Sequence, residues 1–355
     1  MRSELVDMIR EDCRAVVGAR VAELDALRGG CLLVTGGTGF AGTWLAELVS
    51  YLNDQHGFGT RVMLLSSRAH SFSAKAPHLA MRDDVELIER DVRGLFEIPS
   101  EVEWIVHAAG SPDNRLHASD PVRTIAVIVQ GTEAVLSSAA RLPRLRKVLN
   151  ISSGLVYGPQ PWELQAVPET FRSAIDSAAV GSAYAEAKRL AETLCAAYRN
   201  QHRLPIINAR PFAFIGPYQL LDRPWAVNNF VRDGLLGAPI RIQGDGQTVR
   251  SYMYPSDMAW WLLRILASGN TGGNYNVGSP EGVTLLDLAQ RISRLLPKRP
   301  DVLTRQAREG ASRSIFVPDV TLAHRSLGLN VTVDLDTALE RTLAWNTNLI
   351  GKGQP

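Results

Sequence analysis

Cysteine is scarce in this sequence, which contains three in 355 residues. Cys13, Cys31 and Cys195 are too few and too widely spaced for a disulfide framework or a thiolate metal site, so the sequence favours a reducing, cytoplasmic location. None of the seven histidines has HExxH-like spacing, and a catalytic metal is therefore not expected.

An excess of charge of one sign is also lacking, because 38 Lys and Arg face 36 Asp and Glu for a net charge of +2. No dense basic tract is present, so the sequence gives no electrostatic support for binding nucleic acid or a membrane surface. Acidic residues interrupt every apolar stretch of residues 1–30, which argues against a signal peptide or a spanning helix. Small-molecule partners fit this composition better.

Residues 4–28 carry apolar side chains at roughly helical spacing, and Gly29 and Gly30 follow them. This pattern predicts an accessory helix within an N-terminal extension, residues 1–30. The apolar stripe fits either packing on the helix's own domain or a contact with a second copy of the chain, and one stripe does not distinguish the two.

From Cys31 onward, short β-rich runs alternate with helical stretches, as expected for a parallel sheet. The predicted fold class is α/β: a Rossmann-type doubly wound parallel sheet with a smaller α+β substrate lobe and the N-terminal helix. We assign 31–211 and about 246–278 to the dinucleotide-binding domain, and 212–245 and 279–348 to the substrate lobe. Strands are expected at 31–37, 61–67, 85–91, 104–110, 147–153, 205–211 and 272–278, and helices at 41–54, 119–141, 182–202 and from Thr284.

The run LLVTGGTGFAGTWLAELV places three glycines between a hydrophobic strand and a helix. Gly36 permits the tight turn, Gly39 lets the backbone approach a pyrophosphate, and Gly42 permits close packing of helix on strand. The phosphates then lie at the positive end of the helix. The sequence therefore predicts a dinucleotide-binding loop, completed by Thr38, Phe40 and Ala41.

The end of the second strand predicts which dinucleotide is bound. Sites for NAD place an acidic residue there, whereas this sequence has Ser66, Ser67 and Arg68. A serine and an arginine can donate charge-assisted hydrogen bonds to a 2′-phosphate, which favours NADP(H), with NAD(H) as the alternative. That alternative holds if Arg68 is a solvated loop residue and the preference is set elsewhere.

Residues after the third and fourth strands complete the expected cofactor site. Asp91 and Val92 follow the third strand and are candidates for the adenine edge. Ala108 and Ala109 are small enough to let the chain pass beneath the cofactor ribose. His107, in contrast, is expected to be a packed strand residue rather than a ligand or base.

The segment SAYAEAKRLAETLCAAY places Tyr184 and Lys188 four residues apart, on one face of a predicted helix. An adjacent ammonium and an oxidised nicotinamide both favour the phenolate, which brings the phenol toward a working pKa. Ser153, at the end of the fifth strand, is placed to hydrogen-bond a substrate oxygen. A Tyr-x-x-x-Lys pair alone is common by chance, but its place after a glycine loop and a Ser-Ser strand end favours catalysis.

Taken together, these motifs resemble the extended short-chain dehydrogenase/reductase family, the NAD-dependent epimerase/dehydratase group that processes nucleotide sugars, over roughly 31–345. ARPFAFIGP and GDGQTVRSYMYPSDMA are similar to further segments of that family. The resemblance implies that Ser153, Tyr184 and Lys188 form the catalytic triad, that Pro211 lies near the nicotinamide, and that Arg250 binds the substrate diphosphate. It also implies a homodimer built on helices 119–141 and 182–202.

Arg250 makes chemical sense unaided, because a guanidinium matches phosphate oxygens, although it could also be an ordinary surface arginine. Asn228 and Asn229 are candidate contacts of the substrate lobe, although such residues more often serve turns.

Three departures from the family pattern restrict the chemistry. Gly154 and Leu155 stand where the 4,6-dehydratases have an Asp-Glu pair, which argues against dehydration and decarboxylation. Ile128 and Ala213 stand where many members have asparagine, which places a proton relay and a phosphate contact in doubt without touching Tyr184.

The leading hypothesis is NADPH-dependent reduction of a nucleoside-diphosphate 4-keto sugar, such as a 4-keto-6-deoxyhexose, by the Ser153, Tyr184 and Lys188 chemistry. The alternative is C4 epimerisation with a tightly bound NAD. A 4,6-dehydratase and a non-catalytic cofactor-sensing protein are less favoured.

Overall fold

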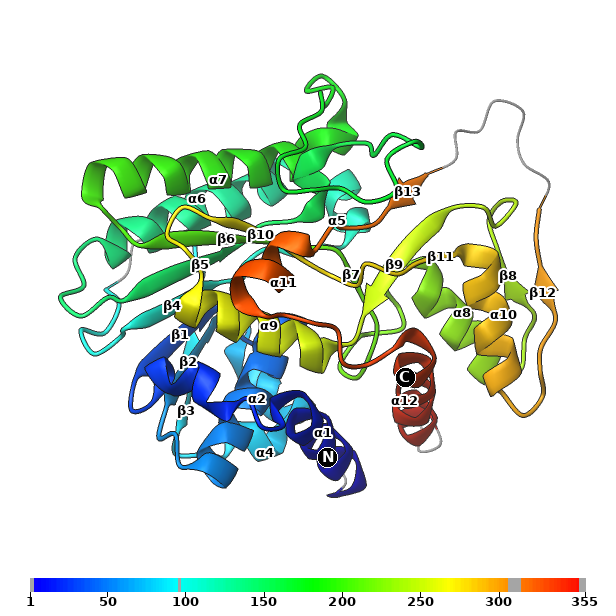
Figure 1. The fold of residues 1–355 in the computed structure, drawn as a ribbon, viewed down its shortest axis with the longest axis horizontal. Helices are drawn as coiled ribbons and strands as arrows, with labels where there is room; N and C mark the ends of the chain where they lie inside the picture. The colour runs from blue at the N-terminus through cyan, green and yellow to red at the C-terminus, as the bar shows by residue number, and fades with distance from the viewer. Residues whose placement is uncertain (1–2, 95–96, 306–313, 351–355) are drawn as a thin grey trace.

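A seven-stranded parallel sheet forms the centre of the larger lobe in the computed structural model, which describes residues 3–94, 97–305 and 314–350 (Figure 1). The strand order is β10-β6-β5-β4-β1-β2-β3. The chain builds outward from β1 to β3 and then from β4 to β10 on the other side, which confirms the doubly wound α/β prediction. The strands are β1 (Cys31–Thr35), β2 (Arg61–Ser66), β3 (Val85–Glu89), β4 (Trp104–His107), β5 (Lys147–Ile151), β6 (Ile206–Pro211) and β10 (Asn274–Val277).

Helices cover both faces of this sheet (Figure 1). One face carries α2 (Phe40–His56) and α9 (Pro255–Ser268), and the other carries α6 (Pro121–Ala139) and α7 (Ala183–His202). Alternate strand residues serve opposite faces: Leu32 and Val34 join the α2 side, whereas Cys31 and Leu33 join the α6 side. Shorter helices are α3 (Phe72–Lys75), α4 (Pro77–Ala80) and α5 (Asn114–Ser119).

The N-terminal extension forms two helical pieces rather than the single helix predicted over 4–28. Helix α1 (Ser3–Val17) ends at Gly18, whose φ is +48°, and a 3₁₀ helix follows over Val21–Leu27. The apolar spacing continues across the break because both pieces bury side chains in the same core, among them Leu5, Ile9 and Leu24. The extension packs against α2 and α9 of its own lobe.

The smaller lobe contains a four-stranded sheet of β7 (Ala213–Phe214), β9 (Val249–Met253), β11 (Gly282–Thr284) and β13 (Ile315–Phe316). Strand β8 (Ile240–Arg241) pairs with β12 (Val302–Leu303). Its helices include α8 (Ala226–Leu235), α10 (Leu285–Leu295) and α12 (Leu335–Ile350). Helix α11 (Thr321–Leu327), although it lies within the range 279–348 assigned to the substrate lobe, packs against β10 and α9 of the larger lobe. The Thr284 hydroxyl caps α10 by accepting from the Asp287 amide at 3.1 Å, at the position where the sequence predicts a helix start.

Strand β9 lies between the two lobes. Within the range 246–278, which the sequence assigns to the dinucleotide-binding domain, α9 and β10 join the large sheet and its covering helices. Strand β9, in contrast, pairs with β7, β11 and β13. Its first residues are half-buried and its last three are buried, so the strand leaves the smaller lobe as it enters the core of the larger one.

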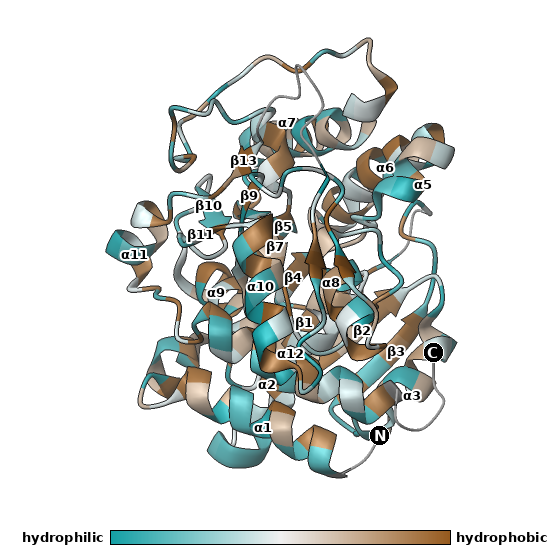
Figure 2. Ribbon diagram, turned by 90° about the vertical axis from the view of Figure 1, so that its right-hand side faces the viewer, coloured by the Kyte–Doolittle hydropathy of each residue, from teal (hydrophilic) through white to brown (hydrophobic). Residues whose placement is uncertain are grey.

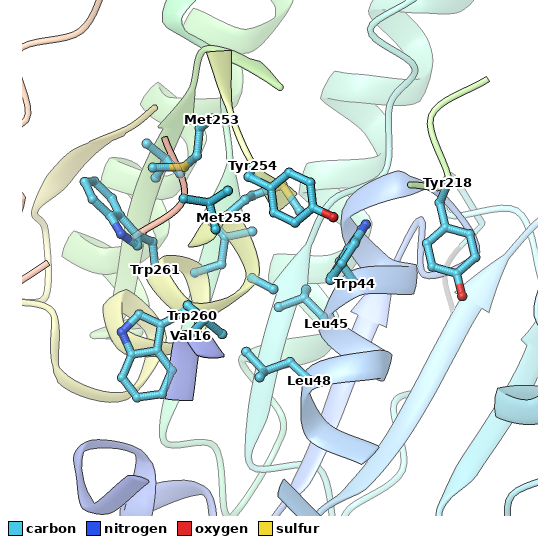
Figure 3. Close-up of a cluster of buried hydrophobic side chains, with 14 of the residues drawn as sticks. Val16, Trp44, Leu45, Leu48, Tyr218, Met253, Tyr254, Met258, Trp260 and Trp261 are labelled. Atoms are coloured by element: carbon cyan, nitrogen blue, oxygen red, sulfur yellow. The ribbon is translucent and has the colours of Figure 1, made fainter. Parts of the chain in front are cut away.

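The largest apolar cluster lies on the α2 and α9 face of the large sheet (Figure 3). Trp44, Trp260 and Trp261 are all fully buried there. Strands β1 to β4 are drawn largely hydrophobic in Figure 2, whereas α1 and α12 carry both hydrophobic and hydrophilic residues. Among the described residues, no helix combines the length and the apolar character that crossing a bilayer requires.

Candidate active site

Three polar side chains are buried together where β5 ends and α7 begins. Ser153, Tyr184 and Lys188 are 8%, 7% and 4% exposed. The Ser153 hydroxyl is hydrogen-bonded to the Tyr184 phenol and accepts from the Leu155 amide at 3.1 Å. The Lys188 ammonium donates to the Ile151 carbonyl at 2.7 Å and lies 5.9 Å from the Tyr184 ring centroid. The structure therefore brings together the three residues that the sequence analysis proposed as catalytic.

Burial is the main influence on the pKa values in this cluster. It raises the pKa of Tyr184 to about 12, against which the Ser153 hydrogen bond acts in the lowering direction. Burial also lowers the pKa of Lys188 to about 8. The sequence predicts that Lys188 lowers the pKa of Tyr184. In the structure the Lys188 ammonium instead donates to a backbone carbonyl, and desolvation of the phenol has the larger effect on its pKa.

His117 on α5 covers the ring of Tyr184, a contact that the sequence analysis did not foresee. The two rings stack at a centroid distance of 4.3 Å with 15° between their planes. The imidazole Nε2 lies 2.8 Å from the Ser111 carbonyl, which can only accept, so Nε2 carries the proton. No spacing pattern relates α5 to α7, and the only available signal was a histidine placed after β4.

The glycine loop joins β1 to α2 with close backbone contacts. A Cβ on Gly36, whose φ is +68°, would lie 2.6 Å from the Ala108 carbonyl oxygen, and one on Gly42 would lie 2.2 Å from that of Gly37. Gly39 is the N-cap of α2 and offers no capping side chain. The amides of the first turn therefore stay available to an anion, and this cradle fits a dinucleotide pyrophosphate.

Lys75 on α3 braces this loop and was also missed by the sequence analysis. Its ammonium donates to the Thr38 carbonyl at 3.1 Å and to the Thr43 hydroxyl at 2.8 Å. Burial lowers the pKa of Lys75 to about 8.

Other side chains of the glycine loop also have partners. The Thr38 hydroxyl donates to the Ser66 hydroxyl at 2.8 Å, which connects the loop to the end of β2. Phe40 stacks on Phe214 of the smaller lobe at 6.0 Å, and Ala41 is half-buried beside it.

The tip of β2 presents serine and arginine to solvent. Ser67 and Arg68 are exposed there. The carboxylate of Glu89, at the end of β3, accepts from the His70 amide at 2.9 Å and lies 2.6 Å from its ring Nδ1. The carboxylate of Glu89 is therefore already engaged in hydrogen bonds with His70.

Asp91 and Val92 differ in their surroundings. Asp91 is exposed and pairs with Arg93 at 2.6 Å, which lowers the pKa of its carboxyl to about 2. Val92 is 7% exposed and packs against Gly131 of α6. The structure thus leaves the acid accessible and places the valine in the core, and their assignment to the adenine edge stays a prediction.

Comparison with known proteins now identifies the family. The profile of the NAD dependent epimerase/dehydratase family matches residues 32–278. The chain belongs to this family. UDP-glucuronic acid decarboxylase 3 of Arabidopsis thaliana is 30% identical over 308 residues, which cover 87% of this chain and 86% of that protein. UDP-glucuronic acid decarboxylase 1 of Danio rerio is 29% identical over 317 residues, 88% of this chain and 72% of that protein.

Solved structures show the same fold. UDP-glucuronic acid 4-epimerase from Bacillus cereus, in complex with UDP-glucuronic acid and NAD, matches with a TM-score of 0.74 and 22% identity, over 90% of this chain and 99% of that one. The family assignment makes the chain an extended short-chain dehydrogenase/reductase enzyme. It also confirms the resemblance on which the sequence analysis relied.

His107 of β4 is a packed residue in this member of the family. It is 3% exposed, with Nδ1 2.7 Å from the Thr35 hydroxyl and Nε2 3.1 Å from the Thr132 hydroxyl. Thr132 donates its own proton to the Ile128 carbonyl, so it accepts from Nε2 and Thr35 donates to Nδ1. Burial lowers the pKa of His107 to about 3, which keeps the ring neutral. The histidine fixes β1, β4 and α6 together.

Three further predicted cofactor residues and the substrate-lobe candidates have defined surroundings in the structure. Ala108 lies against Gly36, Ala109 is buried, and Pro211 ends β6. The polar candidates are occupied by nearby groups: Asn228 donates to the Leu220 carbonyl at 2.6 Å, Asn229 accepts from Arg232 at 3.0 Å, and Arg250 donates to the Val249 carbonyl at 2.7 Å and the Ser314 hydroxyl at 3.1 Å. Their contact with substrate stays a prediction.

Among the described residues, no group of three or more His, Cys, Asp or Glu is placed to hold a metal ion.

Proposed function

We propose that the protein is a nicotinamide-dependent oxidoreductase of nucleotide sugars, and specifically that it reduces a nucleoside-diphosphate 4-keto sugar with NADPH. The observation that carries this proposal is the buried cluster of Ser153, Tyr184 and Lys188 in a chain whose glycine loop fits a dinucleotide. The named activities of the relatives and the fold of the epimerase support a nucleotide-sugar substrate.

Each member of the cluster has a distinct task in such a reaction. Tyr184 donates a proton to the carbonyl oxygen of the sugar, and Ser153, already hydrogen-bonded to the phenol, orients that oxygen. Lys188 holds the cofactor ribose and contributes positive charge near the phenol. The dinucleotide, when bound by the glycine loop, supplies the hydride.

Decarboxylation, the activity named for the relatives, is disfavoured because the two residues after Ser153 carry no carboxylate. A Cβ on Gly154 would lie 2.8 Å from both Phe212 and Phe316, whose rings stack at 4.3 Å. That packing leaves no room for a side chain at the position, and the following residue is Leu155, which is 46% exposed. The absence of a carboxylate here supports simple hydride transfer over elimination or loss of carbon dioxide.

The exposed Ser67 and Arg68 support the preference for NADPH. Arg68→Gln is expected to raise the KM for NADPH tenfold or more, because hydrogen bonds to charged groups contribute about 1.5–3 kcal/mol. The KM for NADH should change less than twofold. Equal effects on the two KM values would show that Arg68 does not set the cofactor preference.

Epimerisation at C4 is the second candidate, supported by the fold shared with an epimerase that is named as a complex with NAD. Incubating the purified protein with a nucleoside-diphosphate 4-keto-6-deoxyhexose and following NADPH absorbance separates the two. Stoichiometric NADPH consumption is expected for the reductase. A retained NAD in native mass spectrometry, with no net NADPH consumption, identifies the epimerase instead.

The assembly and location follow as further proposals. Apolar side chains are exposed on the outer faces of α6 and α7, among them Val122 at 77%, Ile125 at 42% and Leu190 at 47%. Covering such side chains supports a homodimer through these two helices. Sedimentation as a monomer at micromolar concentration would reject the homodimer.

The three cysteines are free and buried, in keeping with a cytoplasmic location.

A further inference from the structure

A basic cavity of about 590 Å³ lies beside α7, at the β6 and β10 edge of the large sheet. Arginines from three segments line it, namely Arg172, Arg189, Arg199 and Arg210, together with one acid, Glu192. Its residues on α7 begin at Arg189, next to Lys188, and extend to Arg199, which is about four turns along α7 from Tyr184, roughly 20 Å. We call this region the arginine cavity. Neither Tyr184 nor the glycine loop lines it.

The single acid of the cavity is already neutralised. Glu192 receives both of its short contacts from Arg210, at 2.9 and 2.7 Å, and the side chains of this pair are 14% and 5% exposed. Such a buried bidentate pair leaves no charge to offset the remaining guanidinium groups. The positive charge of Arg172 and Arg199 is therefore not balanced within the cavity.

The guanidinium groups keep donors available. Arg172 uses one nitrogen, Nη1, for the carbonyls of Glu169 and Phe171. Arg199 is half-buried and makes no hydrogen bond or ion pair with another residue of the described ranges. It lies against Gly272, whose φ is +83° and where a Cβ would approach the guanidinium carbon to 3.1 Å. A glycine at this turn thus leaves room for the arginine beside the cavity.

The floor of the cavity is polar, although a sheet face beneath a helix is normally apolar. Asn208 donates to Asn274 at 2.9 Å and accepts from Asn150 at 2.9 Å, so an amide ladder crosses β5, β6 and β10. Asn208, Asn274 and Arg210 all line the cavity. A polar floor of this kind suits a polar occupant, because apolar groups placed there would desolvate amides without replacing their hydrogen bonds.

We propose that the arginine cavity is a second anion site, which binds a small phosphorylated metabolite independently of the cofactor and substrate phosphates. Guanidinium groups match phosphate oxygens in paired, planar contacts. The volume lies in the range of small-molecule sites, and the near-neutral charge of the whole chain disfavours nucleic acid as the occupant. The proposal does not depend on the reaction catalysed at Tyr184.

Calorimetric titration of the full-length protein with inorganic pyrophosphate, at constant ionic strength and with saturating NADPH, tests this site. Arg199→Gln and Arg172→Gln are each expected to weaken binding about tenfold. Arg241→Gln, an exposed arginine on β8, is the matched control and should bind as the unmodified protein does. Because Arg199 makes no hydrogen bond within the described residues, its substitution should leave the melting temperature without ligand unchanged.

Two outcomes would overturn the proposal. One is the absence of saturable pyrophosphate binding. The other is binding that Arg250→Gln abolishes while Arg199→Gln and Arg172→Gln leave it intact, which assigns the pyrophosphate to the substrate site. Titrations with glucose 1-phosphate and uridine diphosphate then separate the sources of the phosphate: weakening of either by Arg199→Gln supports the site and identifies its ligand as a sugar phosphate or a nucleotide.

Discussion

The two faces of the large sheet differ in what their side chains do. The face under α2 and α9 is closed by a continuous apolar cluster that includes Trp44, Trp260 and Trp261 (Figure 3). The face under α6 and α7 is apolar only in part, because the same strands carry polar side chains there: His107, Asn150, Asn208 and Arg210. Burying polar groups stabilises less than burying hydrocarbon. The first face therefore supplies most of the stability of the fold, and this stability allows the second face to carry the polar side chains that the chemistry requires.

Tyr184→Phe should show the largest effect of the proposed substitutions, because it removes a reacting group from the polar face and leaves the packing of the apolar face intact. Loss of the phenol removes the proposed proton donor and should lower turnover 10³- to 10⁴-fold, about 4–5 kcal/mol in the barrier. The ring and its stack on His117 remain, so the melting temperature should change little. Steady-state kinetics on the nucleotide-sugar substrate, with a thermal melt of the same sample, check both statements; unchanged turnover would remove Tyr184 from the mechanism.

Trp44→Ala, on the apolar face, should in contrast lower the stability of the fold. The side chain is fully buried, packs edge-on against Tyr254 at 6.0 Å, and donates to the Pro217 carbonyl at 3.1 Å. Its removal leaves a cavity and an unpaired carbonyl, and should lower the free energy of unfolding by about 3–4 kcal/mol. Denaturant unfolding measures this loss. Trp162→Ala, at a position 45% exposed, should cost below about 1 kcal/mol, and equal costs at the two sites would contradict the comparison.

His107 should make the polar face sensitive to acid. Its folded-state pKa of about 3 lies below the ordinary value of 6.5, so between these values only the unfolded chain binds the proton. Stability from this group is therefore present above pH 6.5 and is lost as the pH falls, by about 2 kcal/mol at pH 5. His107→Asn should flatten this part of the curve of unfolding free energy against pH. An unchanged slope would mean that other groups cause the acid sensitivity.

The parts of the site that could be predicted from the sequence are those whose chemistry lies within one segment. The glycine loop carries its own steric signature, and Tyr184 and Lys188 share a helix face because they are four residues apart. Lys75 and His117 were missed because each acts on a segment far from it in the chain, and only the folded sheet brings them there.

The same limit explains the errors in the fold. The apolar spacing of 4–28 predicted one helix because it reports which side chains are buried and not whether the backbone is continuous across Gly18. The range 246–278 was assigned to one domain although β9 within it pairs with β7, β11 and β13, because the sequence of a strand does not encode which neighbours it pairs with. The alternation of strands and helices was predictable because hydrophobic period and turn residues are local properties.

His117→Ala should give the smallest effect and shows how the edge of the polar face serves the chemistry. An aromatic stack contributes about 0.5–1.5 kcal/mol beyond buried area, so losing it should lower kcat about tenfold at most, through looser placement of the Tyr184 ring. KM for the sugar should change less than kcat. His117→Phe keeps the stack and should recover most of the turnover, whereas a phenylalanine variant as slow as the alanine variant would show that an imidazole nitrogen, not the stack, is required.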